Sequence, residues 1–188
     1  MKRKQTQLKR DDKFPTDISD ALYNINERAG DGIINQQQYT QEICDLFGED
    51  MPTITKDRNI YLGGFVEGEG SINCSIKISK GSTAGIDLDP EFSVTQHVNG
   101  VKTLIYALVY FKTGRILRKD YKSETNFVLS FRISNTRSII EVVLPFYTEY
   151  IVPYGSRGKV ERFKNFSTLM PFLNNTVHHL ILPRKQIL

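Results

Sequence analysis

Apolar residues recur every three or four positions near the start of the chain, and this spacing predicts two helices. The first covers about 16–28, with Thr16 or Asp17 as its cap, and the second covers about 35–47. Apolar stripes of this kind are typical of packing surfaces. We therefore assign residues 1–56 to an N-terminal arm and helical extension that precedes the core.

Polar and apolar residues alternate in four later segments, which is the period of a strand with one buried face. The first covers 71–79, and the second covers 91–97 after an opening Pro90. The third and fourth, 115–120 and 126–134, are close enough in sequence to form a hairpin. These segments predict a four-stranded antiparallel sheet.

Helical spacing returns between and after these strands. It predicts helices over 101–111, 136–150 and about 159–175, with the middle one split or kinked by Pro145. With a further helix directly before the first strand, the order is helix–strand–strand–helix–strand–strand–helix–helix. This order predicts an α+β domain over 57–188, with all helices on the apolar face of the sheet.

The other face of the predicted sheet is polar and needs solvent or a partner. Its residues are hydrogen-bonding and cationic types, nearly free of carboxylates: Asn73, Ser75, Lys77, Ser79, Ser93, Thr95, Arg115, Lys119, Asn126, Ser130 and Arg132. Such side chains read base edges and hold phosphates, and a twisted antiparallel ribbon fits a major groove about 12 Å wide. An ordinary solvated face is the alternative, but it usually contains more acidic residues. The pattern therefore favours a DNA-binding face.

Composition narrows the class of protein. A chain of 188 residues with 39% hydrophobic content can hold one domain, or one domain with an appendage. Its longest apolar runs fall well short of the roughly 20 residues of a membrane span, and its basic N-terminus lacks the apolar segment of a secretory signal. Cys44 and Cys74 are too few for a disulfide framework or a zinc site. We expect a reducing, intracellular setting, with Cys74 buried in the first strand.

The net charge is +4 and the isoelectric point is near 9.0. The distribution of charge says more than this mild excess. Between Val101 and Arg137 the chain has eight Lys and Arg residues against Asp120 and Glu124 alone. Clustered positive charge is the usual sign of nucleic-acid binding.

One stretch, from Tyr61 to Ser71, combines four glycines and two carboxylates at the end of an apolar run. We expect a helix here, capped by Asp57 or Asn59. Gly64 and Gly68 lie four residues apart on one helical face, where small residues let a second helix approach closely. Glu69 would end this helix, where the helix dipole is already negative. An acid in that place is suited to binding a divalent cation.

The segment Leu62-Gly-Gly-Phe-Val-Glu-Gly-Glu-Gly70 resembles the signature motif of the LAGLIDADG homing endonucleases. Ser71-Ile72 and Phe92-Ser-Val-Thr-Gln96 resemble the same family in the right order, and the similarity covers about 57–175. The resemblance implies the homing-endonuclease fold, αββαββα, with a curved four-stranded antiparallel sheet that has helices on one face and DNA on the other. A single copy of the motif implies the homodimeric branch of the family.

The resemblance also implies individual roles. Glu69 is the expected metal ligand, assisted by the backbone carbonyl of Gly68, and Gln96 is expected to position water. Lys159, or otherwise Arg162, is the expected cation near the scissile phosphate. The motif helix implies a dimer interface made of Leu62, Gly63, Gly64, Phe65, Glu67 and Gly68, in which Glu67 accepts structural hydrogen bonds.

The implied activity is Mg²⁺-dependent hydrolysis of both strands of a long, partly symmetric DNA site with a staggered cut, and Mn²⁺ can substitute. Relatives encoded in organelle introns suggest a chloroplast or a mitochondrion. Two alternatives keep the fold without cleavage: a DNA-binding regulator and an RNA maturase. His97, next to Gln96, is a further candidate base, although an isolated histidine at a strand end is more often incidental.

Overall fold

The computed structural model describes residues 15–78, 85–120 and 127–175. In chain order their elements are α1 (Thr16–Gly30), α2 (Gln36–Phe47), α3 (Lys56–Glu69), β1 (Gly70–Ile78), β2 (Ile86–His97), η1 (Val98–Gly100), α4 (Val101–Phe111), β3 (Arg115–Arg118), β4 (Val128–Ile133), α5 (Thr136–Ser138), η2 (Ile139–Val143), α6 (Leu144–Tyr150) and α7 (Arg157–Asn175). The strands form one antiparallel sheet in the order β1-β2-β4-β3. The predicted fold class and order of elements are confirmed.

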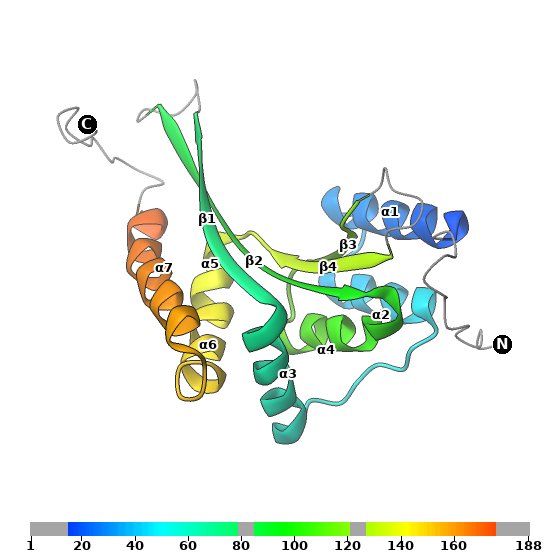
Figure 1. The fold of residues 1–188 in the computed structure, drawn as a ribbon. Coiled ribbons are helices and arrows are strands. Elements are labelled where there is room, and N and C mark those ends of the chain that lie inside the picture. The colour runs from blue at the N-terminus through cyan, green and yellow to red at the C-terminus, as the bar shows by residue number, and fades with distance from the viewer. Residues whose placement is uncertain (1–14, 79–84, 121–126, 176–188) are drawn as a thin grey trace.

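The core lies between the sheet and the helices below it in Figure 1, with α4 under the middle of the sheet. Phe92 of β2 and Phe131 of β4 point to this side and are fully buried. Both rings pack against Phe111 of α4, with ring centroids 5.4 and 5.8 Å away. Each buried side chain of this size contributes about 1.5–3 kcal/mol. The alternation of apolar residues along β2 and β4 therefore selects which face meets the helices.

The N-terminal caps of the first three helices differ partly from the sequence prediction. Helix α2 begins with a capping box, in which Asn35 and Gln38 exchange hydrogen bonds. Helix α1 begins after Pro15 without a side-chain cap. Helix α3 is capped by Thr55, whose hydroxyl accepts from the N–H of Arg58. The expected caps of α1 and α3 were therefore wrong, because several capping residue types stand close together and sequence alone does not choose among them.

Strand β2 begins at Ile86, five residues before the prediction, and continues through Pro90. Proline lacks an N–H group and normally ends or avoids a central strand. Here β4 pairs with β2 only from Phe92 onward, so Pro90 has no partner strand on that side. On the other side Pro90 lies opposite Cys74 of β1. The extra residues lengthen the β1–β2 hairpin, which extends well beyond the helices in Figure 1.

The outer half of the β1–β2 hairpin lies outside the core. Ile76 and Ile78 of β1 are 70% and 92% exposed, although they lie on the face that is apolar nearer the helices. Cys74 faces inward and packs against the core as predicted, but it is only half-buried. The alternation along β1 is regular, but no helix in the described part of the chain covers its outer end.

Pro145 splits the long helix predicted over 136–150. A π-helical turn, η2, precedes it, and Pro145 stands in the first turn of α6. A proline ring clashes with the carbonyl four residues earlier, and a wider turn relieves that clash. In α6, Tyr147 is buried in the core and Tyr150 lies against Gly63 of α3.

Helices α1 and α2 pack beside β3, the edge strand of the sheet (Figure 1). Leu22, Ile25, Tyr39 and Ile43 belong to the same hydrophobic cluster as the sheet residues. The hydroxyl of Tyr39 accepts a hydrogen bond from the N–H of Ile116 in β3, at 2.8 Å. The helical extension is thus joined to the sheet through a shared core and through hydrogen bonds to an edge strand.

Two buried tyrosines, Tyr39 and Tyr147, form a matched pair for measuring how much the hydrogen bond between Tyr39 and Ile116 contributes to stability. Tyr39→Phe leaves the N–H of Ile116 without its acceptor, so we expect the free energy of unfolding to fall by about 1–3 kcal/mol. Tyr147 is fully buried, and its hydroxyl has no hydrogen-bond partner among the described residues. Burial also raises the pKa of Tyr147. We expect Tyr147→Phe to leave the stability unchanged or to raise it. Urea unfolding of the two variants measures both values, and equal losses would contradict this account.

Candidate functional site

The candidate site lies where α3 ends and β1 begins. Glu69 is the last residue of α3 and its side chain is exposed. No hydrogen bond or ion pair to its carboxylate occurs within the described ranges of the chain. The carbonyl groups of a last helical turn lack donors within the helix, so the carbonyl of Gly68 adds a second oxygen nearby. Exposed carboxylate and carbonyl oxygens are the ligands that Mg²⁺ and Ca²⁺ prefer.

Lys159 lies in the first turn of α7 and reaches this helix end. Its ammonium group donates a hydrogen bond to the carbonyl of Gly70, at 2.5 Å. Burial lowers the pKa of Lys159, the Glu67 carboxylate partly opposes this shift, and the charge of Arg162 adds to it. Arg162, the alternative candidate, is exposed and makes no comparable contact in the described structure. The fold therefore brings Lys159 to the residue that directly follows Glu69.

Glu67 has a different environment from Glu69, although they are two residues apart. Its carboxylate accepts a hydrogen bond from the backbone N–H of Ser156, at 3.1 Å. This bond is the main cause of a lowered pKa at Glu67. Glu67 was predicted to accept hydrogen bonds at a dimer interface, and the partner that the structure shows is the loop before α7 of the same chain. One acid of the motif thus ties α3 to the start of α7, and the other remains exposed.

Gln96 lies near the end of β2, two residues beyond Val94, which pairs with Gly70. Its Oε1 accepts a hydrogen bond from the N–H of His97, at 2.7 Å. A Cβ atom at Gly100 would come within 2.6 Å of its Cγ, so a glycine there leaves room for this side chain. The register thus brings Gln96 to the same end of the sheet as Glu69, without a direct contact between them.

The side chain of His97 is hydrogen-bonded to the nearby backbone. Its Nδ1 accepts a hydrogen bond from the N–H of Asn99 and so caps the short helix η1. Its ring lies 5.7 Å from that of Phe127. These contacts explain the histidine without any part in chemistry.

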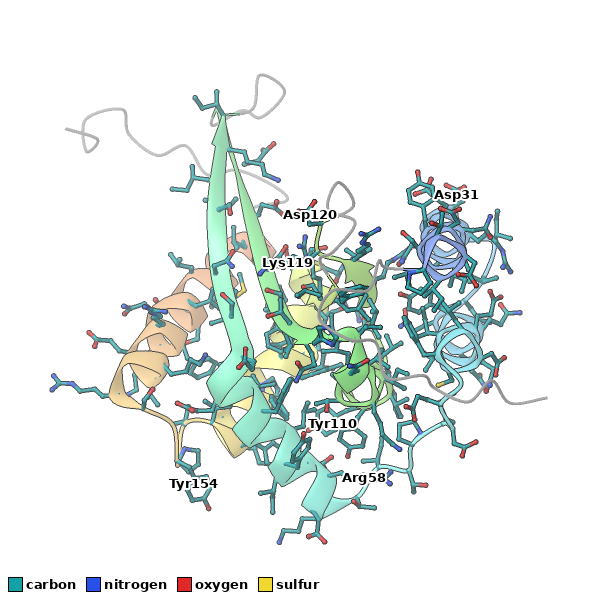
Figure 2. All side chains as sticks on the ribbon, turned by 45° about the vertical axis from the view of Figure 1, so that its right-hand side comes forward. Asp31, Arg58, Tyr110, Lys119, Asp120 and Tyr154 are labelled. Atoms are coloured by element: carbon teal, nitrogen blue, oxygen red, sulfur yellow. The ribbon has the colours of Figure 1, made fainter. Side chains whose placement is uncertain are left out.

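We call the exposed side of the sheet, opposite the helices, the polar sheet face. The register puts Ser71, Ser93, Arg132 and Arg115 side by side across all four strands on this face. The same face contains the other predicted candidates that are described: Asn73, Ser75, Lys77, Thr95, Lys119 and Ser130. Ser79 and Asn126 lie outside the described residues. Figure 2 shows Lys119 next to Asp120, where β3 ends.

The expectation that this face is nearly free of carboxylates was wrong. Because β2 begins at Ile86, Asp87 and Asp89 join Glu91 on the polar sheet face. Asp89 forms an ion pair with Lys77 and raises the pKa of that lysine. Glu91 lies 3.8 Å from a guanidinium nitrogen of Arg132. Two of the predicted cationic residues are therefore paired across strands within the chain.

Two further candidates on the face have unexpected surroundings. Ser130 is 1% exposed, and its hydroxyl accepts from Nε of Arg132 at 3.3 Å, so it is not accessible as a direct contact. Arg115 is half-buried and donates from Nη1 to the carbonyl of Asn26 in α1, at 2.5 Å. A side chain of the same sheet accounts for Ser130 and a contact with α1 accounts for Arg115, and alternation reveals neither.

The motif helix divides its residues between two sides. Leu62 is fully buried in the core of its own chain. Gly63 is also buried, and a Cβ there would lie 2.7 Å from Cβ of Tyr150 in α6. The prediction that Leu62 and Gly63 face a partner was therefore wrong. Phe65 packs partly against the same core and stacks on Tyr61, with ring centroids 6.4 Å apart.

The exposed side of α3 is the one that contains Gly64 and Gly68. A Cβ atom at either glycine would meet nothing within 4 Å. Ile60 and Tyr61 extend this side toward the start of the helix and are 55% and 60% exposed. Neither was predicted as an interface residue, although Ile60, Gly64 and Gly68 share a four-residue spacing that could have indicated them. We call Ile60, Tyr61, Gly64 and Gly68 the open face of α3.

Alanine substitutions at Gly63 and Gly64 test which side of α3 is buried and which is open. Gly63→Ala forces a methyl group against α6, and we expect unfolding stability to fall by about 1–3 kcal/mol. Gly64→Ala adds a methyl to an open surface of the monomer and relieves a helix glycine, so we expect the monomer's stability to rise by up to about 1 kcal/mol. Chemical unfolding at low protein concentration measures both. A large loss in Gly64→Ala alone would contradict the assigned orientation of α3.

Known proteins resemble this chain over most of its length. A family model described as LAGLIDADG endonuclease matches residues 62–173. The DNA endonuclease I-CeuI of Chlamydomonas moewusii is 43% identical over 171 residues, which are 91% of this chain and 77% of that protein.

Solved structures agree with this match. The group I intron-encoded homing endonuclease I-CeuI complexed with DNA superposes with a TM-score of 0.84 at 41% identity, covering 91% of this chain and 81% of that one. The meganuclease I-SmaMI bound to uncleaveable DNA shares the fold, with a TM-score of 0.56 at 24% identity over 69% of this chain and 40% of that one. No helix of the described part of this chain is long and apolar enough to cross a membrane.

Proposed function

The chain belongs to the LAGLIDADG endonuclease family, and we propose that it is a homodimeric homing endonuclease that cuts both strands of a specific DNA site with a stagger. The observation that supports this most directly is the position of Glu69 next to Gly70, whose carbonyl accepts from Lys159 and which pairs with Val94 near the end of β2. An exposed acid and a half-buried cation at the start of β1, beside the polar sheet face, suit hydrolysis of a phosphodiester.

Members of this family use a divalent metal ion, and we propose Mg²⁺ here, with Mn²⁺ as a substitute. The donor set fits, because the exposed carboxylate of Glu69 and the carbonyl of Gly68 both offer oxygen. When bound, the metal ion would polarise phosphate and water oxygens. Gln96 would orient the attacking water, since a neutral amide can donate and accept hydrogen bonds but is not a general base.

Lys159 would bring positive charge to the phosphate. Its ammonium group is already fixed by the carbonyl of Gly70, and the bond between Glu67 and Ser156 fixes the start of α7. A cation held in place before the reaction stabilises charge that develops on the phosphate oxygens without first having to reorganise.

A second chain would complete the site. No group of three or more His, Cys, Asp or Glu suited to a metal gathers among the described residues of one chain. The open face of α3 admits a partner helix because Gly64 and Gly68 have no side chains. A groove of about 260 Å³ beside Gly64, lined also by Ile60, Tyr150 and Tyr154, leaves room for partner side chains. If two α3 helices met there around a twofold axis, two Glu69 carboxylates would converge.

The polar sheet face would hold a long, partly symmetric double-stranded target, one half-site for each chain. The acids on this face make it mixed in charge rather than uniformly basic. Asp89 and Glu91 hold Lys77 and Arg132 in place through ion pairs. Cations held in this way suit base contacts as well as phosphate contacts. We further propose that the protein acts inside the cell, with an organellar genome as the compartment suggested by the intron-encoded relative.

A DNA-binding regulator and an RNA maturase remain the alternative functions. Either could use the polar sheet face, but neither requires an acid and a cation at the end of α3. Cleavage assays therefore separate them from the endonuclease.

Glu69→Gln tests the proposed role of the motif acid. We expect plasmid cleavage with Mg²⁺ to fall more than about 100-fold, because the amide removes the charge that attracts the metal. DNA binding should persist in a gel-shift assay. Glu141→Gln, which changes an exposed acid paired with Arg137, is the matched control and should cleave normally. Binding without cleavage in the unmodified protein would support the regulator instead.

The pH dependence of cleavage tests Lys159. Because its pKa lies below the ordinary lysine value of 10.5, its charge is present below that lowered pKa and is lost as the pH rises through it. We expect the cleavage rate to fall on the alkaline side, and we expect Lys159→Arg to move this fall to higher pH because arginine keeps its charge. Lys164→Arg, an exposed site on the same helix, serves as the control. An unchanged alkaline limb in Lys159→Arg would assign the limb to another group.

A further inference from the structure

Strand β3 is a short edge strand, and its outer side faces no other strand among the described residues. The backbone groups of Ile116 on this side nevertheless have partners. The N–H of Ile116 donates to the Tyr39 hydroxyl at 2.8 Å, and the carbonyl of Ile116 accepts from Nδ2 of Asn26 at 2.9 Å. Just before the strand, the carbonyl of Gly114 accepts from Nε2 of Gln36 at 3.2 Å. Side chains of α1 and α2 thus take the place of a neighbouring strand.

The same side chains form a connected group. The Tyr39 hydroxyl also contacts Oδ1 of Asn26 at 3.1 Å, and Nδ2 of Asn26 also donates to the carbonyl of Leu22 at 2.9 Å. Asn26 is 8% exposed and Tyr39 is 1% exposed. A buried and mutually bonded pair has little freedom to move, so it fixes the position of Ile116 along the edge.

Both arginines of β3 are also attached to the N-terminal helices. Arg115, on the polar sheet face, donates to the carbonyl of Asn26, and its guanidinium lies 5.9 Å from the centroid of the Tyr39 ring. Arg118 is 8% exposed, and its Nη1 donates to the Ser19 hydroxyl at 3.2 Å. A slip of one residue would reverse the faces of all these side chains. The helices therefore hold both the register of β3 and the direction of Arg115.

We propose that α1 and α2 are positioning elements for DNA recognition, which fix β3 and the guanidinium of Arg115 so that they read one block of base pairs in each half-site. This inference rests on the proposed function. A side chain fixed before binding loses less conformational entropy on the DNA and tolerates fewer alternative bases. The N-terminal helices would then act on sequence preference without themselves touching the DNA.

The experiment compares cleavage profiles on libraries of randomised half-sites. Arg115→Lys first identifies the block that Arg115 reads, because lysine lacks the planar fork that recognises a base edge. Tyr39→Phe is then profiled at a temperature at which circular dichroism shows it to be folded. We expect it to relax base preference about tenfold within that same block. Its cleavage rate at saturation on the preferred site should change less than about threefold.

Tyr147→Phe is the matched control, since it removes a buried tyrosine hydroxyl from the core away from β3, and its profile should equal that of the unmodified protein. If Tyr39→Phe fails to fold, Gln36→Ala removes only the bond to Gly114 and should relax the same block to a smaller degree. An unchanged profile, or equal relaxation at every position, would overturn the inference and leave the helices as stabilising elements only. Failure of the unmodified protein to cut any site would instead refute the proposed function.

Discussion

The structure depends on the close approach of α3 to α6 at Gly63. With no side chain at this position, the motif helix can lie against Tyr150, bury Leu62 and still leave its opposite side uncovered. The same helix must end at Glu69 and continue directly into β1, so its packing determines where the acid lies relative to the sheet. Moving α3 outward to make room for a side chain at Gly63 would move Glu69 away from Lys159. Core packing and site geometry are thus one constraint.

The start of α7 is coupled to this helix by two hydrogen bonds of different kinds. Glu67 accepts from a backbone N–H of the preceding loop, and Lys159 donates to the carbonyl of Gly70. Both contacts join residues 89 positions apart in the chain. They explain why two acids of one motif can have separate tasks. Glu67 is hydrogen-bonded and holds the loop before α7, whereas Glu69 remains exposed and could bind a cation.

In the proposed function, the polar sheet face recognises DNA through a balance of charges rather than through a uniform basic surface. Acidic residues along β2 lie opposite Lys77 and beside Arg132, and they reduce the general attraction of the face to phosphates. Fixed and partly neutralised cations favour discrimination between sequences over indiscriminate affinity. In the proposed positioning role, helices α1 and α2 contribute to the same discrimination, because they hold the edge strand that contains Arg115.

The sequence by itself determined the class of fold, the order of elements and the identity of the motif. Alternation and helical spacing are local properties, and they located α4 and the separate strands because one face of each element must be apolar. The motif also carried Glu69 and its glycines as a contiguous run that could be recognised without a structure. Local patterns were enough wherever a residue's task depends on its immediate neighbours.

Only the tertiary structure decided which side of α3 is open, that Lys159 rather than Arg162 reaches Gly70, and that Ser130 is covered. It also showed that β2 passes through Pro90 and brings Asp89 to Lys77. The physical reason is the same in each case. A helix face, a cross-strand ion pair or an edge hydrogen bond depends on residues distant in sequence, and periodicity along one segment contains no information about which segment packs against it.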